Sequence, residues 1–240
     1  MAELPEYTIR ESMRAKHVIL KMSLHDGFVV VVPQGFDVRR VPKIIEEKRE
    51  WIERKAKQIQ QKRNALDKDL APRKILLRAI DEEWTVAYEQ KNHSSWIDMD
   101  IPGERLLLLS GNTTNHSLIR RALRSFLLVK ARMDLPGLLL SMADEHGFVV
   151  SKASVRFQKT RWGTCSFQGA ISLNAKLLLL PRDLVDYVMI HELCHTVHHN
   201  HSPEFWQLVQ EHLPQAQALR RTLLDDAWRF VPLWLEGQGS

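Results

Sequence analysis

Hydrophobic and polar positions in the first third of the chain follow the pattern of paired strands. Two apolar runs, Val18–Met22 and Phe28–Val32, flank the tripeptide His25-Asp26-Gly27. An Asp-Gly pair between two such runs is a strong signal for a β-hairpin. Similar patterns occur farther along, and the strand regions expected in the N-terminal half cover residues 7–33, 74–88 and 97–110.

A long helix is expected between the first two of these strand regions. From Pro42 to Asn64, apolar residues recur at the three- and four-residue spacing of one helical face. Glu50 lies four residues before Arg54, which is a favourable orientation for an ion pair within a helix. A polar linker, Asp67 to Pro72, follows this helix.

The pattern changes near Gly111, after which helices and short strands alternate. Pro136 is expected to divide one apolar helical stretch, because proline lacks the backbone N–H that a helix interior needs. The elements expected here are helices over residues 118–133, 136–146 and 181–195, a further helix from residues 202–203, strands over 148–157 and 169–174, and a loop over 158–168. We therefore predict an α+β fold, with a β-rich region carrying one long basic helix over residues 1–110 and a second domain over 111–240.

The composition is that of an ordinary globular protein. With 240 residues, 44% of them hydrophobic and 26% charged, the chain is neither collagen-like, nor a coiled-coil rod, nor intrinsically disordered. Its longest apolar runs fall far short of the roughly 18 residues of a membrane-spanning helix. The N-terminal residues show no secretory signal pattern, and the two cysteines, Cys165 and Cys194, form no disulfide framework. A reducing, cytoplasmic setting is therefore expected.

The net charge of +5 is concentrated in one segment. Residues 39–78 contain 14 Lys and Arg against 6 Asp and Glu, a net +8, so the remainder of the chain carries −3. A basic segment of this kind can attract nucleic acid or another polyanion. The alternative interpretation is a solvated helix face, and both remain open.

The most informative motif is His191-Glu192-Leu-Cys-His195, which has the spacing H-E-x-x-H. Residues four apart on a helix lie on one face a turn apart, so both imidazoles can bind one zinc ion. Glu192 is then placed to take a proton from water that the metal activates. The flanking residues from Val185 to Ile190 are mostly apolar, which indicates a buried helix in which these polar groups need a metal or other partners.

A third protein ligand is expected, because catalytic zinc sites usually combine three protein ligands with one open position. The candidates after the motif are His198, His199, His201, Glu204 and Glu211. Asn200 tolerates a left-handed conformation and Ser202-Pro203 starts a new helix, so His201 lies in a turn and can return to the metal. This placement favours His201 over Glu204 and Glu211.

Five segments of the C-terminal half carry a family resemblance. They are Arg161-Trp-Gly-Thr-Cys-Ser166, Ile171-Ser-Leu-Asn174, Leu180-Pro181, His191-Glu-Leu-Cys-His195 and Asn200-His-Ser-Pro-Glu-Phe-Trp206. Together they resemble the YgjP-like metal-dependent hydrolases, bacterial relatives of the SprT-like and WLM zinc metallopeptidases. Thr164 and Cys194 depart mildly from the family pattern. The resemblance implies a zincin-like core, a small sheet over the motif helix, whose metal ligands and catalytic base are His191, His195, His201 and Glu192.

Three residues near the motif are candidates for binding substrate. Arg161 offers a charge for an anionic or carbonyl oxygen, and Trp162 offers a wall for the pocket. Tyr187, one helical turn before His191, offers a hydroxyl to a substrate oxygen. For all three, the alternative is a packing role beside the motif helix.

These residues predict a zinc-dependent hydrolase, with a metallopeptidase as the leading function and an exposed strand near residues 154–157 holding an extended peptide. A nucleoside triphosphate pyrophosphatase or phosphohydrolase is the first alternative, although the chain has no P-loop sequence. The second is a nucleic-acid-associated module with structural zinc, which Glu192 disfavours because a structural site needs no base. Zinc is the expected cofactor, and manganese or nickel also suits such ligands.

Overall fold

The computed structural model describes residues 5–23, 27–66, 70–91 and 95–235. The chain divides into two compact units, residues 1–69 and 70–240. The boundary expected after residue 110 is therefore corrected to the polar linker around residue 69. The reason is that strands before residue 111 share a hydrophobic core with the helices that follow. None of the described helices is both long and apolar enough to cross a lipid bilayer.

The first unit contains a three-stranded sheet in the order β1-β3-β2. Its strands are β1 (Tyr7–Ser12), β2 (Ile19–Ser23) and β3 (Gly27–Pro33). The antiparallel pairing of β2 with β3 confirms the expected hairpin, whereas the turn residues His25 and Asp26 lie outside the described residues. β1 pairs with the other edge of β3 in parallel.

The expected long helix is present as two consecutive helices, α1 (Val41–Glu47) and α2 (Arg49–Leu66). They are separated at Lys48, whose backbone leaves the helical region with φ −110° and ψ 14°. Val41 and Ile45 of α1 and Ile52 of α2 are buried with apolar side chains of β3. Both helices therefore contribute to the core of the first unit.

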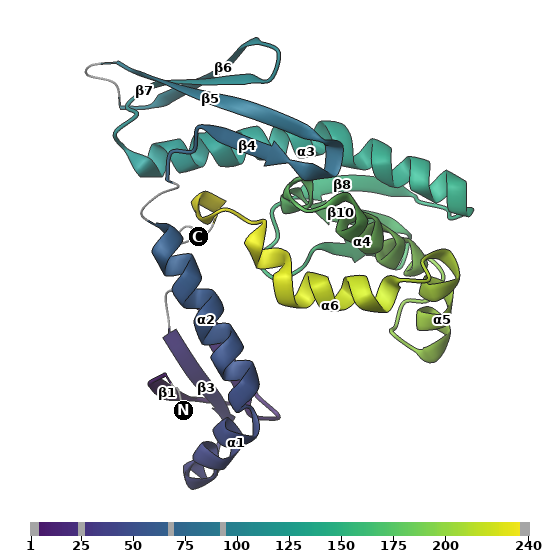
Figure 1. Ribbon diagram of the computed structural model, residues 1–240. Helices are drawn as coiled ribbons and strands as arrows, with labels where there is room; N and C mark the ends of the chain where they lie inside the picture. Colours follow the sequence, from purple (N-terminus) through teal and green to yellow (C-terminus); the bar gives the residue numbers. More distant parts are fainter. Residues whose placement is uncertain (1–4, 24–26, 67–69, 92–94, 236–240) are drawn as a thin grey trace. The chain divides into compact units, whose positions relative to one another are not determined.

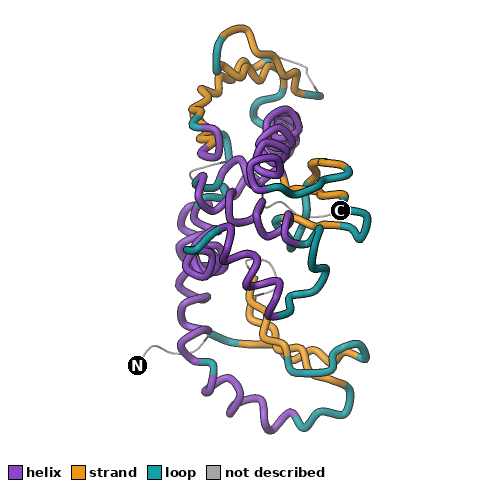
Figure 2. Tube along the Cα trace, turned by 90° about the vertical axis from the view of Figure 1, so that its right-hand side faces the viewer, coloured by secondary structure: helices purple, strands orange, loops and turns teal. Residues whose placement is uncertain are grey.

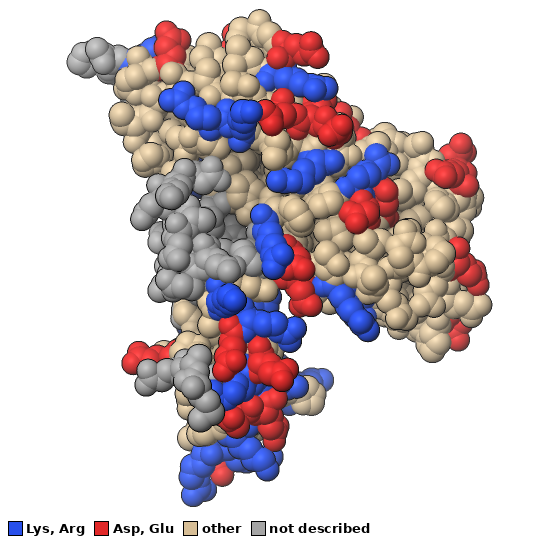
Figure 3. All heavy atoms as spheres, in the orientation of Figure 1, with Lys and Arg blue, Asp and Glu red and all other residues tan. Residues whose placement is uncertain are grey.

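Basic and acidic side chains are interspersed over α1 and α2 (Figure 3). The guanidinium of Arg49 lies 2.8 Å from the carboxylate of Glu46 and 3.5 Å from that of Glu53. Exposed pairs of this kind add little stability, but they offset part of the positive charge of residues 39–78. Polyanion binding by this segment stays a prediction.

The second unit begins with a four-stranded sheet in the order β4-β5-β7-β6. Its strands are β4 (Lys74–Leu77), β5 (Glu82–Gln90), β6 (Ile97–Gly103) and β7 (Leu106–Gly111). The strand regions expected over residues 74–88 and 97–110 each contain an antiparallel pair. Each connection contains a polar residue in the left-handed conformation, Asp81 with φ 51° and Arg105 with φ 54°.

The helix α3 (His116–His146) runs without a break, which corrects the interruption expected at Pro136. Leu135 and Leu139 on either side of the proline are fully buried, so core packing compensates for the backbone hydrogen bond that proline cannot make. Gly147 ends the helix in the left-handed conformation, with φ 74°.

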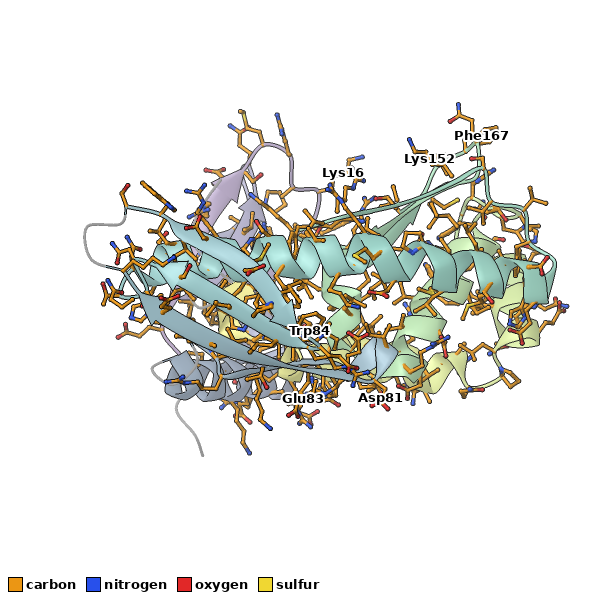
Figure 4. The ribbon with its side chains drawn as sticks, turned by 90° about the horizontal axis from the view of Figure 1, so that it is seen from above. Lys16, Asp81, Glu83, Trp84, Lys152 and Phe167 are labelled. Atoms are coloured by element: carbon orange, nitrogen blue, oxygen red, sulfur yellow. The ribbon has the colours of Figure 1, made fainter. Side chains whose placement is uncertain are left out.

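The helix α3 lies between the two sheets of the second unit (Figure 1 and Figure 2). On the side of the first sheet, Trp84 of β5, which is labelled in Figure 4, meets Phe126 of α3 edge-on, with ring centroids 4.8 Å apart. The ammonium of Lys130, one turn farther along α3, lies 3.0 Å from the Glu82 carboxylate. These contacts join the first sheet to α3.

The second sheet has the order β8-β10-β9. Its strands are β8 (Lys152–Arg156), β9 (Gly163–Cys165) and β10 (Ala170–Asn174). β9 was not expected, because residues 158–168 carry a loop composition, and β8 is shorter than the predicted strand over 148–157. Phe167 projects from the turn that joins β9 to β10 (Figure 4).

Three helices complete the second unit: α4 (Arg182–Cys194), α5 (Pro203–His212) and α6 (Ala216–Asp226). α4 contacts β9, α5 and α6, so the helix of the His-Glu motif packs beside a small sheet as expected. The α+β class is confirmed. Both cysteines are free thiols, whereas the cytoplasmic setting stays a prediction.

Candidate metal centre

The helix α4 carries the first part of the site. Its apolar residues are almost entirely buried, and Glu192 among them is only 6% exposed. His191 lies in the last turn and His195 caps the end of the helix. As the four-residue spacing predicts, both imidazoles lie on the same side of the helix, with ring centroids 4.9 Å apart and an interplanar angle of 88°.

The third histidine is supplied by the turn between α4 and α5. α4 ends at Cys194 and α5 begins at Pro203, so His201 lies in the connection between the two helices. Its Nε2 lies 3.1 Å from the Nε2 of His191. One nitrogen from each of the three histidines lies within 4.8 Å of the others. In the described part of the chain, this is the one group of three or more potential metal ligands, and none of the other candidates belongs to it.

The donor set of these histidines fits a divalent metal. Two ligands about 2.0–2.1 Å from a tetrahedral zinc lie about 3.3 Å apart, close to the separation between His191 and His201. The Nδ1 of His195 donates a hydrogen bond to the carbonyl of His198 at 2.9 Å, which leaves its Nε2 lone pair available. Burial, with the neighbouring histidines, lowers the pKa of His191 to about 3, so its ring is neutral, as metal binding requires.

Two aromatic rings from α5 hold the histidines in place. Phe205, fully buried, stacks on His195 with ring centroids 4.4 Å apart and an interplanar angle of 24°. Trp206 stacks on His201 at 5.6 Å and 25°. These two residues therefore orient two of the three imidazoles.

Glu192 lies against the backbone of β9. A Cβ built on Gly163 would be 2.6 Å from the Cγ of Glu192 and 2.7 Å from its Oε1, so only glycine fits here. Burial raises the pKa of Glu192 to about 7, and the positive charge of Arg161 opposes this rise. Among the described residues, the carboxylate has neither a hydrogen bond nor an ion pair with another side chain.

The segment before β9 is fixed by Asn174, which is 2% exposed. Its side-chain amide donates hydrogen bonds to the carbonyls of Gln158, at 3.0 Å, and Arg161, at 2.7 Å. Its backbone N–H donates to the carbonyl of Trp162 at 2.8 Å. Asn174 therefore determines how this segment approaches Glu192.

A cleft of about 820 Å³ opens over the three histidines. The residues predicted for the site that line it are His191, His195, His201, Glu192, Arg161, Trp162 and Tyr187. Helix α6 adds Arg220, Leu223 and Leu224. The strand predicted to hold a peptide, residues 154–157, does not line this cleft, whereas β9 does.

Comparison with known proteins identifies the family. The chain matches the family described as YgjP-like, metallopeptidase domain, over residues 16–226. The chain belongs to this family. Among solved structures, the crystal structure of the metallopeptidase zymogen of Pyrococcus abyssi abylysin is similar, with 28% sequence identity over 38% of this chain and 93% of that chain, and a TM-score of 0.34. The comparison with curated proteins finds no match.

Membership of the YgjP-like metallopeptidase family implies a zinc-type metal and a hydrolytic activity. Both agree with the donor set of the three histidines. Arg220 also lines the cleft of this YgjP-like protein, but the sequence analysis does not predict it, because it lies outside every motif. Its position in the cleft depends on how α6 packs on α4, and no local pattern encodes that packing.

Proposed function

We propose that this protein is a metal-dependent peptidase in which His191, His195 and His201 hold the metal and Glu192 is the general base. The observation that carries the proposal is the set of three imidazole nitrogens within 4.8 Å of one another, in a cleft that also contains the unpaired carboxylate of Glu192. A divalent metal held there polarises a substrate carbonyl and lowers the pKa of water. Zinc is the metal that three histidines favour.

Glu192 performs the proton transfers. Its carboxylate oxygen takes a proton from the attacking water while the new C–O bond forms at the scissile carbonyl carbon. It returns this proton to the amide nitrogen as the C–N bond breaks, so the leaving group departs as a neutral amine. Burial raises the pKa of Glu192, which makes its carboxylate a stronger base than an exposed one. A side chain at position 163 would displace this carboxylate, because an added Cβ would lie 2.7 Å from its Oε1.

β9 provides the binding edge for an extended peptide. Among the described strands, it pairs with β10 alone, and its residues Gly163, Thr164 and Cys165 line the cleft. Its second edge therefore offers backbone groups for β-addition. Trp162 and Tyr187, which also line the cleft, supply a wall for the peptide side chains.

Hydrolysis of nucleoside triphosphates is the second candidate function. The observation that favours it is the presence of two arginines, Arg161 and Arg220, in the lining of the cleft. The metallopeptidase family favours peptides. A nucleic-acid-binding module with structural zinc is disfavoured. A structural zinc site has four protein ligands and no open position, so it would not need a carboxylate such as Glu192 in an open cleft.

A substrate panel tests this proposal. Purified protein of measured metal content is incubated with casein-derived peptides and, separately, with nucleoside triphosphates, before and after removal of the metal with a chelator. We expect peptide cleavage that chelation abolishes and added zinc restores. Triphosphate turnover without peptide cleavage would contradict the peptidase assignment.

A further inference from the structure

Two arginine side chains in the cleft form no ion pair with a described carboxylate. Some basic side chains of the second unit pair with carboxylates, as Arg182 does with Asp186 at 2.7 Å. The guanidinium groups of Arg161 and Arg220 form no ion pair or hydrogen bond with the described residues. Both are exposed in the cleft, so they are available to a ligand.

Arg220 is positioned by the metal centre itself. Its guanidinium carbon lies 4.8 Å from the ring centroid of Trp206. The same indole stacks on His201. His201, Trp206 and Arg220 thus form a chain of contacts that places one positive charge beside the histidines, on the side formed by α6.

Arg161 is positioned from the sheet side of the cleft. Its carbonyl accepts a hydrogen bond from the amide of Asn174 at 2.7 Å, which anchors its backbone directly before β9. Gly163, two residues later, presses against Glu192. The second positive charge therefore stands near the catalytic carboxylate, on the side formed by β9.

The cleft offers these two arginines little counter-charge: Arg161 interacts electrostatically with Glu192, but neither guanidinium forms an ion pair with a described carboxylate. Among the described lining residues, Glu192 is the one acidic side chain. The remaining lining is aromatic, aliphatic, histidine or uncharged polar, apart from the two arginines. An unpaired guanidinium in such a cleft favours a carboxylate, which it binds through two parallel N–H···O bonds.

We propose that the cleft selects peptides with acidic residues flanking the scissile bond, with Arg161 and Arg220 as the specificity-determining residues. The proposal rests on the peptidase function above. Each arginine binds one carboxylate, Arg161 from the sheet side and Arg220 from the α6 side of the metal centre. A charge-assisted hydrogen bond of this kind corresponds to about a 10-fold preference over the uncharged amide.

Matched fluorogenic peptides test this selectivity. They differ only in having Glu, Gln or Lys on either side of one apolar centre. We expect kcat/KM for the Glu peptides to exceed that for the Gln peptides about 10-fold, with the Lys peptides cleaved more slowly still. In Arg220→Gln, the preference on one side of the bond disappears, and in Arg220→Glu it reverses toward Lys. Arg161→Gln removes the preference on the other side.

A binding measurement separates selectivity from turnover. Glu192→Gln is loaded with zinc, and its affinity for the same peptides is measured by calorimetry, where about 10-fold tighter binding of the Glu peptides is expected. Arg221→Gln is the matched control, because Arg221 neighbours Arg220 on α6 but does not line the cleft. Equal binding and equal cleavage of Glu, Gln and Lys peptides would overturn the selectivity and leave the peptidase function standing. Triphosphate turnover with no peptide cleaved or bound would overturn both.

Discussion

The backbone of Gly163 and the side chain of Glu192 are in direct contact. A Cβ added at Gly163 would lie 2.6–2.8 Å from three atoms of the glutamate, a distance that real Cβ atoms do not reach. The glutamate that would transfer the proton is therefore held by a strand that lines the same cleft. This contact explains why the segment Arg161–Ser166 has glycine at its third position, Gly163.

Gly163→Ala is expected to displace Glu192 and lower kcat about 10- to 100-fold, with the metal content unchanged. The comparison is the steady-state rate of peptide cleavage beside the zinc content of the same sample. Gly137→Ala in α3 is the matched control, because nothing lies within 4 Å of its added Cβ. It should keep full activity and gain about 0.5–1 kcal/mol of stability, since alanine favours a helix over glycine. Full activity in Gly163→Ala would show that the contact is unimportant.

His201→Ala is expected to lower bound zinc as much as His195→Ala does, because both remove one of the three proposed imidazole ligands. Zinc is measured by elemental analysis after dialysis against a weak chelator. His199→Ala is the control, because His199 lines the cleft and contacts the ring of Phe167 but lies outside the three-histidine group. Retention of wild-type zinc by His201→Ala would contradict the assignment of the third ligand.

Asn174→Ala is expected to destabilise the protein by about 1–3 kcal/mol, because two carbonyls lose their hydrogen-bond donors. The free energy of unfolding is obtained from urea denaturation. Asn174→Asp should behave similarly, because the carboxylate cannot donate to the carbonyls of Gln158 and Arg161. In both variants, peptidase activity should be lost at urea concentrations well below the midpoint of global unfolding, because the segment before β9 is no longer held in place. An unchanged midpoint in both would refute the role given to Asn174.

The pair His146 and His212 predicts a pH-dependent stability outside the cleft. Their Nδ1 atoms lie 3.1 Å apart, and the pKa of His212 is lowered by burial and by the charge of His146. The folded protein therefore binds fewer protons than the unfolded chain, so stability is lost as the pH falls below the ordinary histidine value of about 6.5. His212→Gln should reduce the drop in melting temperature between pH 7.5 and pH 5.5. An identical drop in both proteins would contradict this linkage.

Most of the site can be predicted from local sequence, because its geometry is set over short distances. His191 and His195 need only the helical repeat, and His201 needs only the turn made by Asn200 and Ser202-Pro203. The stacking of Phe205 and Trp206 on the histidines depends on the angle between α4 and α5. Arg220 requires the packing of a third helix, which leaves no pattern in the residues around it.

The fold shows the same division between local and tertiary information. Hydrophobic alternation correctly predicts strand regions, but it does not locate the turns near Asp81 and Arg105, where a polar residue in the left-handed conformation reverses the chain. Pro136 is a strong local signal for a helix break, and buried leucines on both sides override it. β9 has three residues, too few for any periodicity to be visible.

Glu192→Gln tests the central claim most directly, because it removes the base while keeping the size of the side chain. Zinc content and peptide cleavage are measured on the same samples of wild type and variant. We expect unchanged zinc and a loss of kcat/KM of about 100- to 10,000-fold, the contribution typical of a general base. Wild-type cleavage by a fully zinc-loaded Glu192→Gln would contradict the proposed mechanism.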